Sequence, residues 1–261
     1  MTFFTRFSSR SGRSLNAEQR KAVEVADSLR NEIGLIGSRM VKCKENCRGI
    51  SCDLNNGRIP RCLYLDGDAG SFGFIVVGLN PGKAKDKEEE AYKNALKEGK
   101  DRYFVFTEYF RKHVLPSKYY KNIREMLEII QKRLHDKPLR LTKMPILWTE
   151  LVKCQSVKNG SLNDNTLRMC LNKYLKEEIR LVPGEWIIIA NGRKTYDVCV
   201  VVFENRVVIG IPHCTSSRGH FKKLVEKLKN SKSTTNKQLE ELLKSHKSKH
   251  GLAGWLGAKP K

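Results

Sequence analysis

A short apolar run that ends in a tight turn constrains the fold of this chain more than any other feature. Residues 74–79 (FIVVGL) are followed directly by Asn80-Pro81-Gly82. An apolar run of this length, bounded by turn residues, is typical of a buried strand. In an open α/β sheet such a strand presents its carboxyl end to the crevice where ligands bind. The sequence therefore predicts that Asn80 lies at a ligand site on a rigid element.

Further apolar runs alternate with stretches of helical spacing. We expect three more strands, at 145–152, 186–190 and 207–211, and helices near 15–38, 84–100, 121–134, 163–180 and 219–229. This alternation predicts a three-layer αβα fold with a central, mainly parallel four-stranded sheet. We divide the chain into a basic arm and helix (1–40), an α/β domain (41–230) and a basic tail (231–261), which is interpreted as a solvated or DNA-skimming extension.

The charge of the chain indicates a polyanionic partner. Lys and Arg number 50 against 28 Asp and Glu, a formal net charge of +22. Such an excess suits binding to the phosphate backbone of DNA, although a merely soluble or ribosome-associated basic protein has the same composition. We expect no membrane partner, because no apolar run has the length of a membrane span, and we expect a monomer in the cytoplasm. Eight cysteines without a secretion signal favour metal or cluster ligation over disulfides.

Two later segments make the first motif specific to one kind of protein. Residues 207–220 (VVIGIPHCTSSRGH) lead from a strand into a loop with a histidine, small hydroxyls and an arginine. Residues 149–154 (TELVKC) are followed by Cys170 at C-x15-C spacing. Together the three segments resemble the uracil-DNA glycosylase superfamily, whose motifs are Gly-x-x-Pro-Gly and a His-Pro-Ser-type loop followed by Arg. The third segment is similar to that of the iron–sulfur branch, family 4. The resemblance covers roughly residues 40–230.

The resemblance implies a monofunctional DNA glycosylase that hydrolyses the N-glycosidic bond of a flipped-out uracil or modified pyrimidine. Such an enzyme must extrude the base, stabilise negative charge on it and place a water below the sugar. Asn80 matches the family position that orients this water, and His213 matches the histidine whose neutral N–H stabilises charge on the pyrimidine O2. The alternatives are a turn-stabilising asparagine and a structural histidine. Cys214 replaces the proline of the family motif.

The resemblance also implies residues that bind the base and the DNA. Gly78 and Leu79 belong to the first motif and are expected beside the base. For the ring that stacks on the base we consider Phe104, Phe106, Tyr119 and Tyr120, and we put forward Phe104 and Tyr120, although helix-spaced aromatics more often lie in a core. The expected DNA contacts are Lys83, Ser216, Ser217 and Arg218.

Five cysteines are candidate ligands. Cys154 and Cys170 align with two cluster ligands of the iron–sulfur branch. The other pair is ambiguous: Cys47 and Cys52 fit best, with Cys43 in reserve. Four thiolates suit a structural [4Fe–4S] cluster and equally a tetrahedral Zn²⁺. The remaining cysteines, Cys62, Cys199 and Cys214, are interpreted as unligated.

Glu150 departs from the resembling branch, which has Asn at this position to read uracil. A carboxylate cannot donate to the uracil O4, whereas a protonated carboxyl can donate to the cytosine N3 and accept from its N4 amine. We therefore expect a cytosine-derived base, and an Asn at 150 is expected to gain uracil excision. The alternative is a shifted alignment, with Glu150 only in a salt bridge at the end of a strand.

Three other functions stay open. A non-catalytic nucleic-acid-binding module would keep the fold and the basic surface, but it does not require both Asn80 and His213. An iron–sulfur redox protein would explain the cysteines and leave the other two motifs unexplained. An anti-phage glycosylase that acts on hypermodified cytosine would follow from the interpretation of Glu150.

Overall fold

A six-stranded mixed sheet organises the described part of the chain. The computed structural model describes residues 17–45, 47–67, 72–82, 86–134, 144–156, 162–215, 218–246 and 251–257, with the backbone alone for 17–26 and 246. The strands are β2 (Tyr64–Asp66), β3 (Phe74–Gly78), β4 (Ile146–Glu150), β6 (Ile187–Asn191), β7 (Val208–Ile211) and β8 (Ala253–Trp255). Their order is β2-β4-β3-β6-β7-β8, and only β2 is antiparallel to its neighbour. A separate ribbon pairs β1 (Ile50–Ser51) with β5 (Gln155–Ser156).

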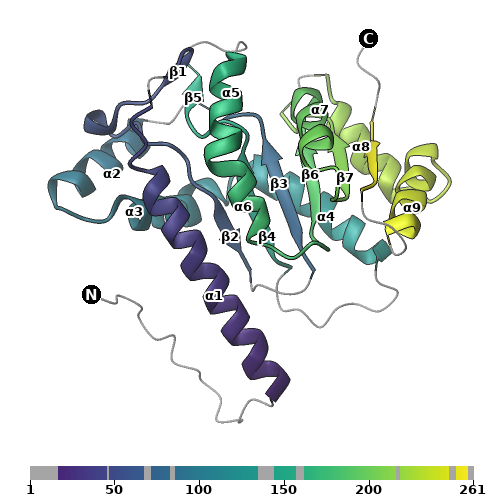
Figure 1. Cartoon of the computed structure of the whole chain (residues 1–261). Helices are drawn as coiled ribbons and strands as arrows, with labels where there is room; N and C mark the ends of the chain where they lie inside the picture. The colour runs from purple at the N-terminus through teal and green to yellow at the C-terminus, as the bar shows by residue number, and fades with distance from the viewer. Residues whose placement is uncertain are drawn as a thin grey trace.

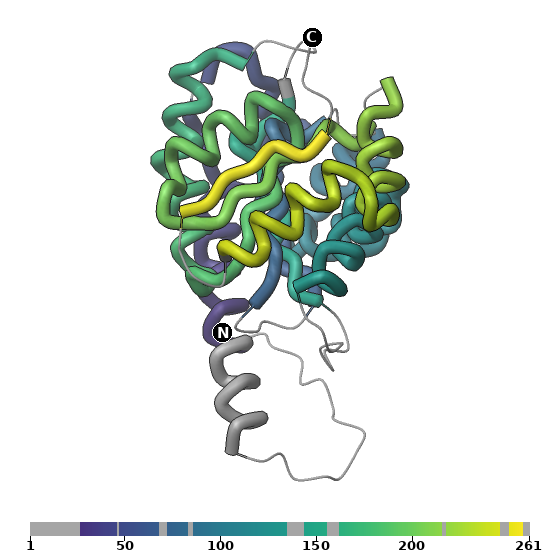
Figure 2. The backbone as a smooth tube through the Cα atoms, turned by 90° about the vertical axis from the view of Figure 1, so that its right-hand side faces the viewer, coloured from purple at the N-terminus to yellow at the C-terminus, as the bar shows by residue number. Residues whose placement is uncertain are grey.

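Helices cover both faces of this sheet. They are α1 (Ala17–Met40), α2 (Asp86–Lys97), α3 (Arg102–Tyr109), α4 (Lys118–Leu134), α5 (Asp164–Cys170), α6 (Lys176–Arg180), α7 (Arg193–Val202), α8 (His220–Lys229) and α9 (Thr234–His246). The short segments are η1 (Leu54–Asn56) and two π-helical turns, η2 (Phe110–Val114) and η3 (Leu171–Leu175). In Figures 1 and 2, α5, α6 and α7 lie on one face, and α4 and α8 on the other. The architecture is therefore α/β in three layers.

Burial explains why the apolar runs form the central strands. Every residue of β3, β6 and β7 is buried, as parallel strands covered on both faces require. Trp186 leads into β6 and is fully buried, and a Cβ on Gly73 would lie 2.8 Å from its ring. The four strands expected from the sequence correspond to β3, β4, β6 and β7. The expected number of strands was wrong, because β2 and β8 extend the sheet at its two edges.

The C-terminal segment belongs to the core, which corrects the interpretation of 231–261 as a solvated tail. Within its described residues, β8 pairs in parallel with β7, and Leu239, Leu243 and Leu256 are buried. Leu256 N donates to Gly210 O at 2.8 Å. Gly257 follows with φ of +120°, and a Cβ there would lie 2.6 Å from the Pro212 ring. The segment contains few leucines among many Lys and Ser residues, so its composition predicted a solvent-exposed extension. In the structure these leucines pack in a helix and beside a strand.

None of the described helices combines the length and the apolar character that a membrane crossing requires.

Replacing Leu239 by Ala tests the packing of α9 in the core. We expect the free energy of unfolding to fall by about 2–5 kcal/mol, because a fully buried leucine leaves a cavity. Chemical denaturation measures this loss. The control Lys244→Ala, at an exposed position of the same helix, should change stability by no more than about 0.5 kcal/mol. A Leu239→Ala protein as stable as the control would contradict a packed C-terminal segment.

Candidate active site

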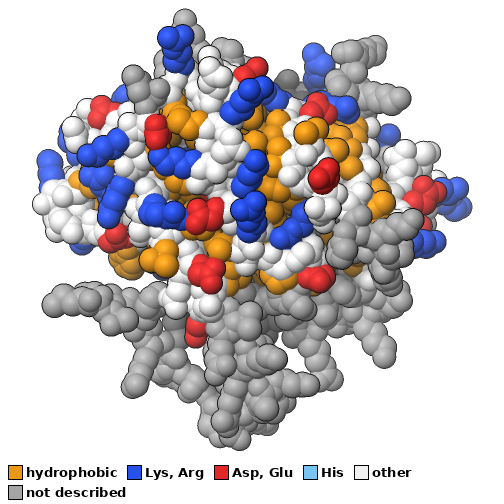
Figure 3. Space-filling model, in the orientation of Figure 1, with side chains coloured by type: hydrophobic (Ala, Val, Ile, Leu, Met, Phe, Trp, Pro, Cys, Tyr) orange, Lys and Arg blue, Asp and Glu red, His pale blue; other side chains and the backbone are white. Residues whose placement is uncertain are grey.

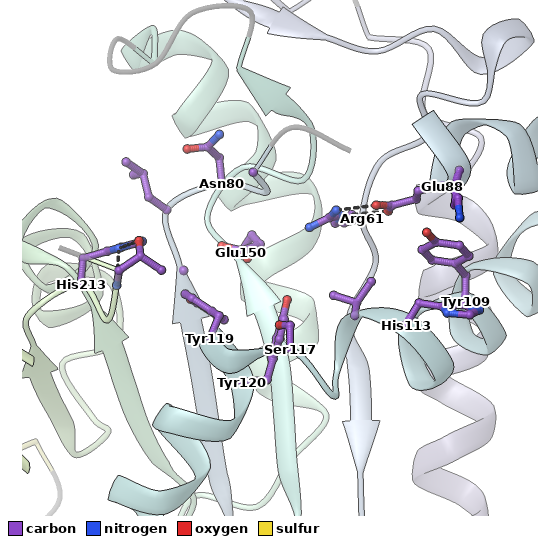
Figure 4. Close-up of a pocket in the computed structure, with 16 residues that line it drawn as sticks. Arg61, Asn80, Glu88, Tyr109, His113, Ser117, Tyr119, Tyr120, Glu150 and His213 are labelled. Carbon is purple, nitrogen blue, oxygen red and sulfur yellow. Dashed lines mark hydrogen bonds and ion pairs between the residues drawn. The ribbon is translucent and has the colours of Figure 1, made fainter. Parts of the chain in front are cut away.

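A cavity of about 510 Å³ opens at the carboxyl ends of β3, β4 and β7. The strand β3 lies between β4 and β6, so the chain passes from β3 to β4 in one direction along the sheet and then from β4 back past β3 to β6 in the other. Such a switch point leaves a crevice where α/β proteins bind ligands. Figure 4 shows the side chains that face this cavity, from His213 on one side through Glu150 to His113 on the other.

Asn80 lies in the cavity wall directly after β3, where the sequence predicted it. Its Nδ2 donates to the carbonyl oxygen of Pro81 at 3.1 Å, which fixes the orientation of the amide. Within the described part of the chain, the Oδ1 atom accepts no hydrogen bond from another residue. The amide therefore offers an acceptor to a water or a ligand in the cavity.

His213 reaches the same cavity from the end of β7. Its Nδ1 lies 2.9 Å from Thr215 Oγ1 and accepts from the Thr215 backbone N–H at 3.4 Å. An accepting Nδ1 puts the proton of a neutral ring on Nε2. Desolvation lowers the pKa of His213 below its ordinary value and so favours this neutral form. The imidazole is thereby prepared as a neutral N–H donor.

Glu150 ends β4 and faces the cavity directly opposite Gly78. A Cβ on residue 78 would lie 1.9 Å from the carboxylate of Glu150, so a side chain at this position would displace that carboxylate. Desolvation raises the pKa of Glu150 to about 7, although the charges of Arg61 and Lys153 oppose the rise. Near neutral pH the group therefore exists as both carboxyl and carboxylate. Leu79, the neighbour of Gly78, also lines the cavity.

Two adjacent tyrosines supply the rings at the centre of the cavity. Tyr119 and Tyr120 come from the first turn of α4, and both line the cavity. Tyr119 Oη accepts from Asn191 Nδ2 at 2.5 Å, and Tyr120 packs edge-on against Trp148 with the ring centroids 4.8 Å apart. Phe104 is instead 60% exposed on α3 and does not line the cavity, which corrects its prediction as a base-stacking residue.

The far end of the cavity holds residues that the sequence did not single out. Arg61 forms a two-pronged ion pair with Glu88, with Nη2–Oε2 2.8 Å and Nε–Oε1 3.2 Å. Tyr109 and His113, whose ring centroids lie 4.8 Å apart, face the same space from α3 and η2. We call these four residues the distal lobe. The sequence around Glu88 predicts a charged, exposed helix, and Arg61 lies in a cysteine-rich stretch. Nothing in either pattern indicated that these two residues line a cavity.

The predicted DNA contacts are only partly described. Lys83, Ser216 and Ser217 lie outside the described residues. Arg218 is exposed immediately before α8 and does not line the cavity. On the face drawn in Figure 3, the described Lys and Arg side chains are spread over the surface rather than gathered in one patch.

All five candidate cysteine ligands come together around a second, much smaller cavity. It is lined by Cys43, Cys47, Cys52, Cys154 and Cys170. The Cys52 and Cys154 thiols interact, which lowers the pKa of Cys52 and raises that of Cys154, and burial with the neighbouring thiols raises the pKa of Cys47 to about 11. The space left between the side chains, about 10 Å³, is about the size of a single water molecule. As they stand, no three Cys, His, Asp or Glu side chains among the described residues are arranged to hold a metal ion.

The three cysteines interpreted as unligated do not line this second cavity. Cys62 and Cys199 are buried elsewhere in the core, and Cys214 faces the carbonyl oxygen of Tyr119 at 3.9 Å.

A buried ion pair joins the two cavities. Lys153 Nζ donates to Glu178 Oε2 at 2.7 Å and to Thr149 Oγ1 at 2.6 Å, and neither charged side chain is more than 1% exposed. Lys153 lines the cysteine cavity, while its backbone oxygen accepts from Arg61 N at 2.7 Å. The segment between Glu150 and Cys154 is therefore fixed at both ends.

Replacing Glu150 by Gln should remove a pH dependence of stability. The pKa of Glu150 is about 7 in the folded protein, against an ordinary 4.5. Between these values the folded chain binds more protons than the unfolded chain, so the free energy of unfolding falls as the pH rises, by at most about 3 kcal/mol. Denaturation of wild type and Glu150→Gln at a series of pH values measures the difference.

The matched control for this titration is Glu241→Gln, at an exposed position of α9, which should keep the wild-type pH profile. If Glu150→Gln follows the wild-type profile as well, Glu150 does not have a raised pKa.

Comparison with known proteins adds no family to these observations. No protein-family model matches the chain, and no curated protein matches it.

Proposed function

We propose that this protein is a monofunctional DNA glycosylase of the uracil-DNA glycosylase superfamily, which hydrolyses the N-glycosidic bond of a flipped-out uracil or modified pyrimidine. One observation carries the proposal. Asn80, Glu150 and His213 come from the ends of three strands and line a single cavity of about 510 Å³. Segments far apart in the sequence, which resemble the motifs of one family, thus meet at one site.

In the proposed hydrolysis, Asn80 and His213 each have a task. The open Oδ1 of Asn80 accepts from the attacking water and orients it, while the bond to Pro81 O keeps the amide in place. The Nε2–H of His213 donates to the pyrimidine O2, where negative charge grows as the base leaves. A neutral imidazole can donate this hydrogen bond from Nε2, and desolvation favours the neutral form of His213.

The raised pKa of Glu150 allows this residue to pair with a cytosine-derived base. At a pKa of about 7, a large share of the molecules carries the proton that cytosine N3 needs as a donor. The other carboxyl oxygen then accepts from the N4 amine, which gives two hydrogen bonds to one edge of the base. Uracil has a hydrogen on N3 and an acceptor at O4, and the same protonated carboxyl can pair with these groups in the opposite sense, so the excision assay has to identify the base.

The basic charge of the chain supports DNA as the partner. A net charge of +22 favours association with a phosphate backbone at low salt. Arg218, exposed at the start of α8 and near the loop of His213, is the described candidate for a phosphate contact.

The cysteine cavity is proposed to hold a structural [4Fe–4S] cluster, with Zn²⁺ as the alternative. Five thiols offer one donor more than either group requires. The remaining space of about 10 Å³ accommodates a single ion more readily than a cluster. Binding a cluster would require the thiols to move apart, and the segment with Cys43, Cys47 and Cys52 lies largely outside regular helices and strands. The bound group would join this segment to the core through Cys154 and Cys170.

The activity is tested on oligonucleotides that carry one uracil, 5-hydroxymethylcytosine or glucosylated 5-hydroxymethylcytosine. We expect abasic sites to form with at least one of them. Asn80→Ala should lower the rate about a hundredfold or more, because the water loses its orienting group. Strand cleavage after mild alkali measures the product.

The matched control is Asn94→Ala, an exposed asparagine on α2, which should keep the wild-type rate. Glu150→Asn in the uracil arm tests how the base is recognised. Tight DNA binding without any base release would contradict the proposal and favour a binding module.

Metal content tests the cysteine cavity independently of activity. Protein purified without oxygen should contain iron and sulfide, or zinc alone, and Cys154→Ser or Cys170→Ser should remove most of it. Elemental analysis measures the metal. Cys199→Ser, at a buried cysteine outside the cavity, should retain the wild-type metal content. Metal-free wild-type protein would contradict both forms of the proposal.

A further inference from the structure

The cavity is larger than the chemistry proposed for it requires. Asn80, Glu150 and His213 need one pyrimidine ring and its sugar between them, whereas the cavity measures about 510 Å³. Pockets of roughly 300–1,000 Å³ bury ligands of drug-like size, and a single pyrimidine fills only a fraction of such a space. The volume beyond Glu150 therefore has no occupant in the proposed reaction so far.

The order of atoms around a pyrimidine indicates what enters that volume. O2, N3, the exocyclic group on C4 and then C5 follow one another along the edge of the ring. With O2 at His213 and N3 at Glu150, the edge continues toward C5 on the side away from His213. Figure 4 shows the distal lobe on this side, with Arg61, Glu88 and their neighbours across Glu150 from the histidine. A substituent on C5 would consequently point into the distal lobe.

The side chains of the distal lobe define the chemistry of this substituent. Arg61 and Glu88 neutralise each other through their two short contacts, and the buried Glu88 also accepts from Tyr92 Oη at 3.3 Å. A neutral pair that presents both donors and acceptors suits hydroxyl groups, which donate and accept at once. The rings of Tyr109 and His113 add a flat wall. Because these two charges offset each other, the pair itself gives no net attraction to a charged substituent.

We propose that the distal lobe binds a bulky, uncharged, hydroxyl-bearing substituent on C5 of the target base, such as a sugar. This inference rests on the proposed glycosylase activity and names its substrate more closely. Tyr109 and His113 contact the substituent with their rings, and the Arg61–Glu88 pair exchanges hydrogen bonds with its hydroxyls. Glu150 then reads the cytosine edge while the distal lobe reads the modification.

The test compares excision rates on four oligonucleotides that differ only in one base: uracil, cytosine, 5-hydroxymethylcytosine and its glucosylated form. We expect the glucosylated base to be released about tenfold or more faster than the hydroxymethylated one, which corresponds to one or two additional hydrogen bonds. Tyr109→Ala and His113→Ala should reduce this ratio about tenfold. Tyr109→Phe, which keeps the ring, should retain most of the ratio.

The control is Lys112→Ala, an exposed neighbour of His113 that does not line the cavity, and it should leave the ratio unchanged. Thermal unfolding of each variant confirms that it is folded.

The outcomes separate this inference from the proposed function. Equal release of the hydroxymethylated and glucosylated bases, fastest release of unmodified uracil, or a ratio that neither alanine variant changes would overturn the role of the distal lobe and leave the glycosylase intact. Release of none of the four bases would overturn the glycosylase, and this inference with it.

Discussion

The buried ion pair between Lys153 and Glu178 is the interaction on which both cavities depend. Two charges with so little exposure are stable only because each has a partner, and removal of either one typically costs about 3–5 kcal/mol. The side chain of Lys153 also holds Thr149 in β4, and its backbone oxygen holds Arg61. One residue thereby sets the position of the strand end that carries Glu150, of Arg61 in the distal lobe and of the neighbouring Cys154.

The raised pKa of Glu150 in the large cavity depends on how the neighbouring charges are paired. Arg61 lies near enough to oppose the protonation of Glu150, but its guanidinium is engaged by Glu88. Lys153 is similarly engaged by Glu178. Desolvation therefore outweighs the attraction of both cations, and a share of Glu150 stays protonated near neutral pH. The two cations lower the pKa of Glu150 without cancelling the effect of burial, and each is already paired with another carboxylate.

The sequence predicted the parts of the structure that depend on local pattern. Uninterrupted apolar runs identified β3, β4, β6 and β7, and turn residues after them placed Asn80 and His213 at the correct edge of the sheet. It did not predict β8, because its pairing with β7 depends on a neighbour distant in the chain. The sequence also did not show which of Phe104 and Tyr119 faces the cavity. Both are aromatic residues in the same stretch of the chain, and only the packing of α3 and α4 places Tyr119 in the cavity and Phe104 outside it. The distal lobe is assembled entirely by such tertiary packing.

The position of β8 has a consequence for synthesis of the protein. This strand covers the outer edge of β7, and residues 256 and 257 contact the backbone and the proline immediately before His213. While a ribosome is still making the segment after β7, that edge presents unpaired backbone groups, which in other proteins promote aggregation. The loop of His213 also lacks its final support during this time. The pairing of β8 therefore closes the edge of β7 beside the residues that precede His213, and this edge stays open until β8 has been made.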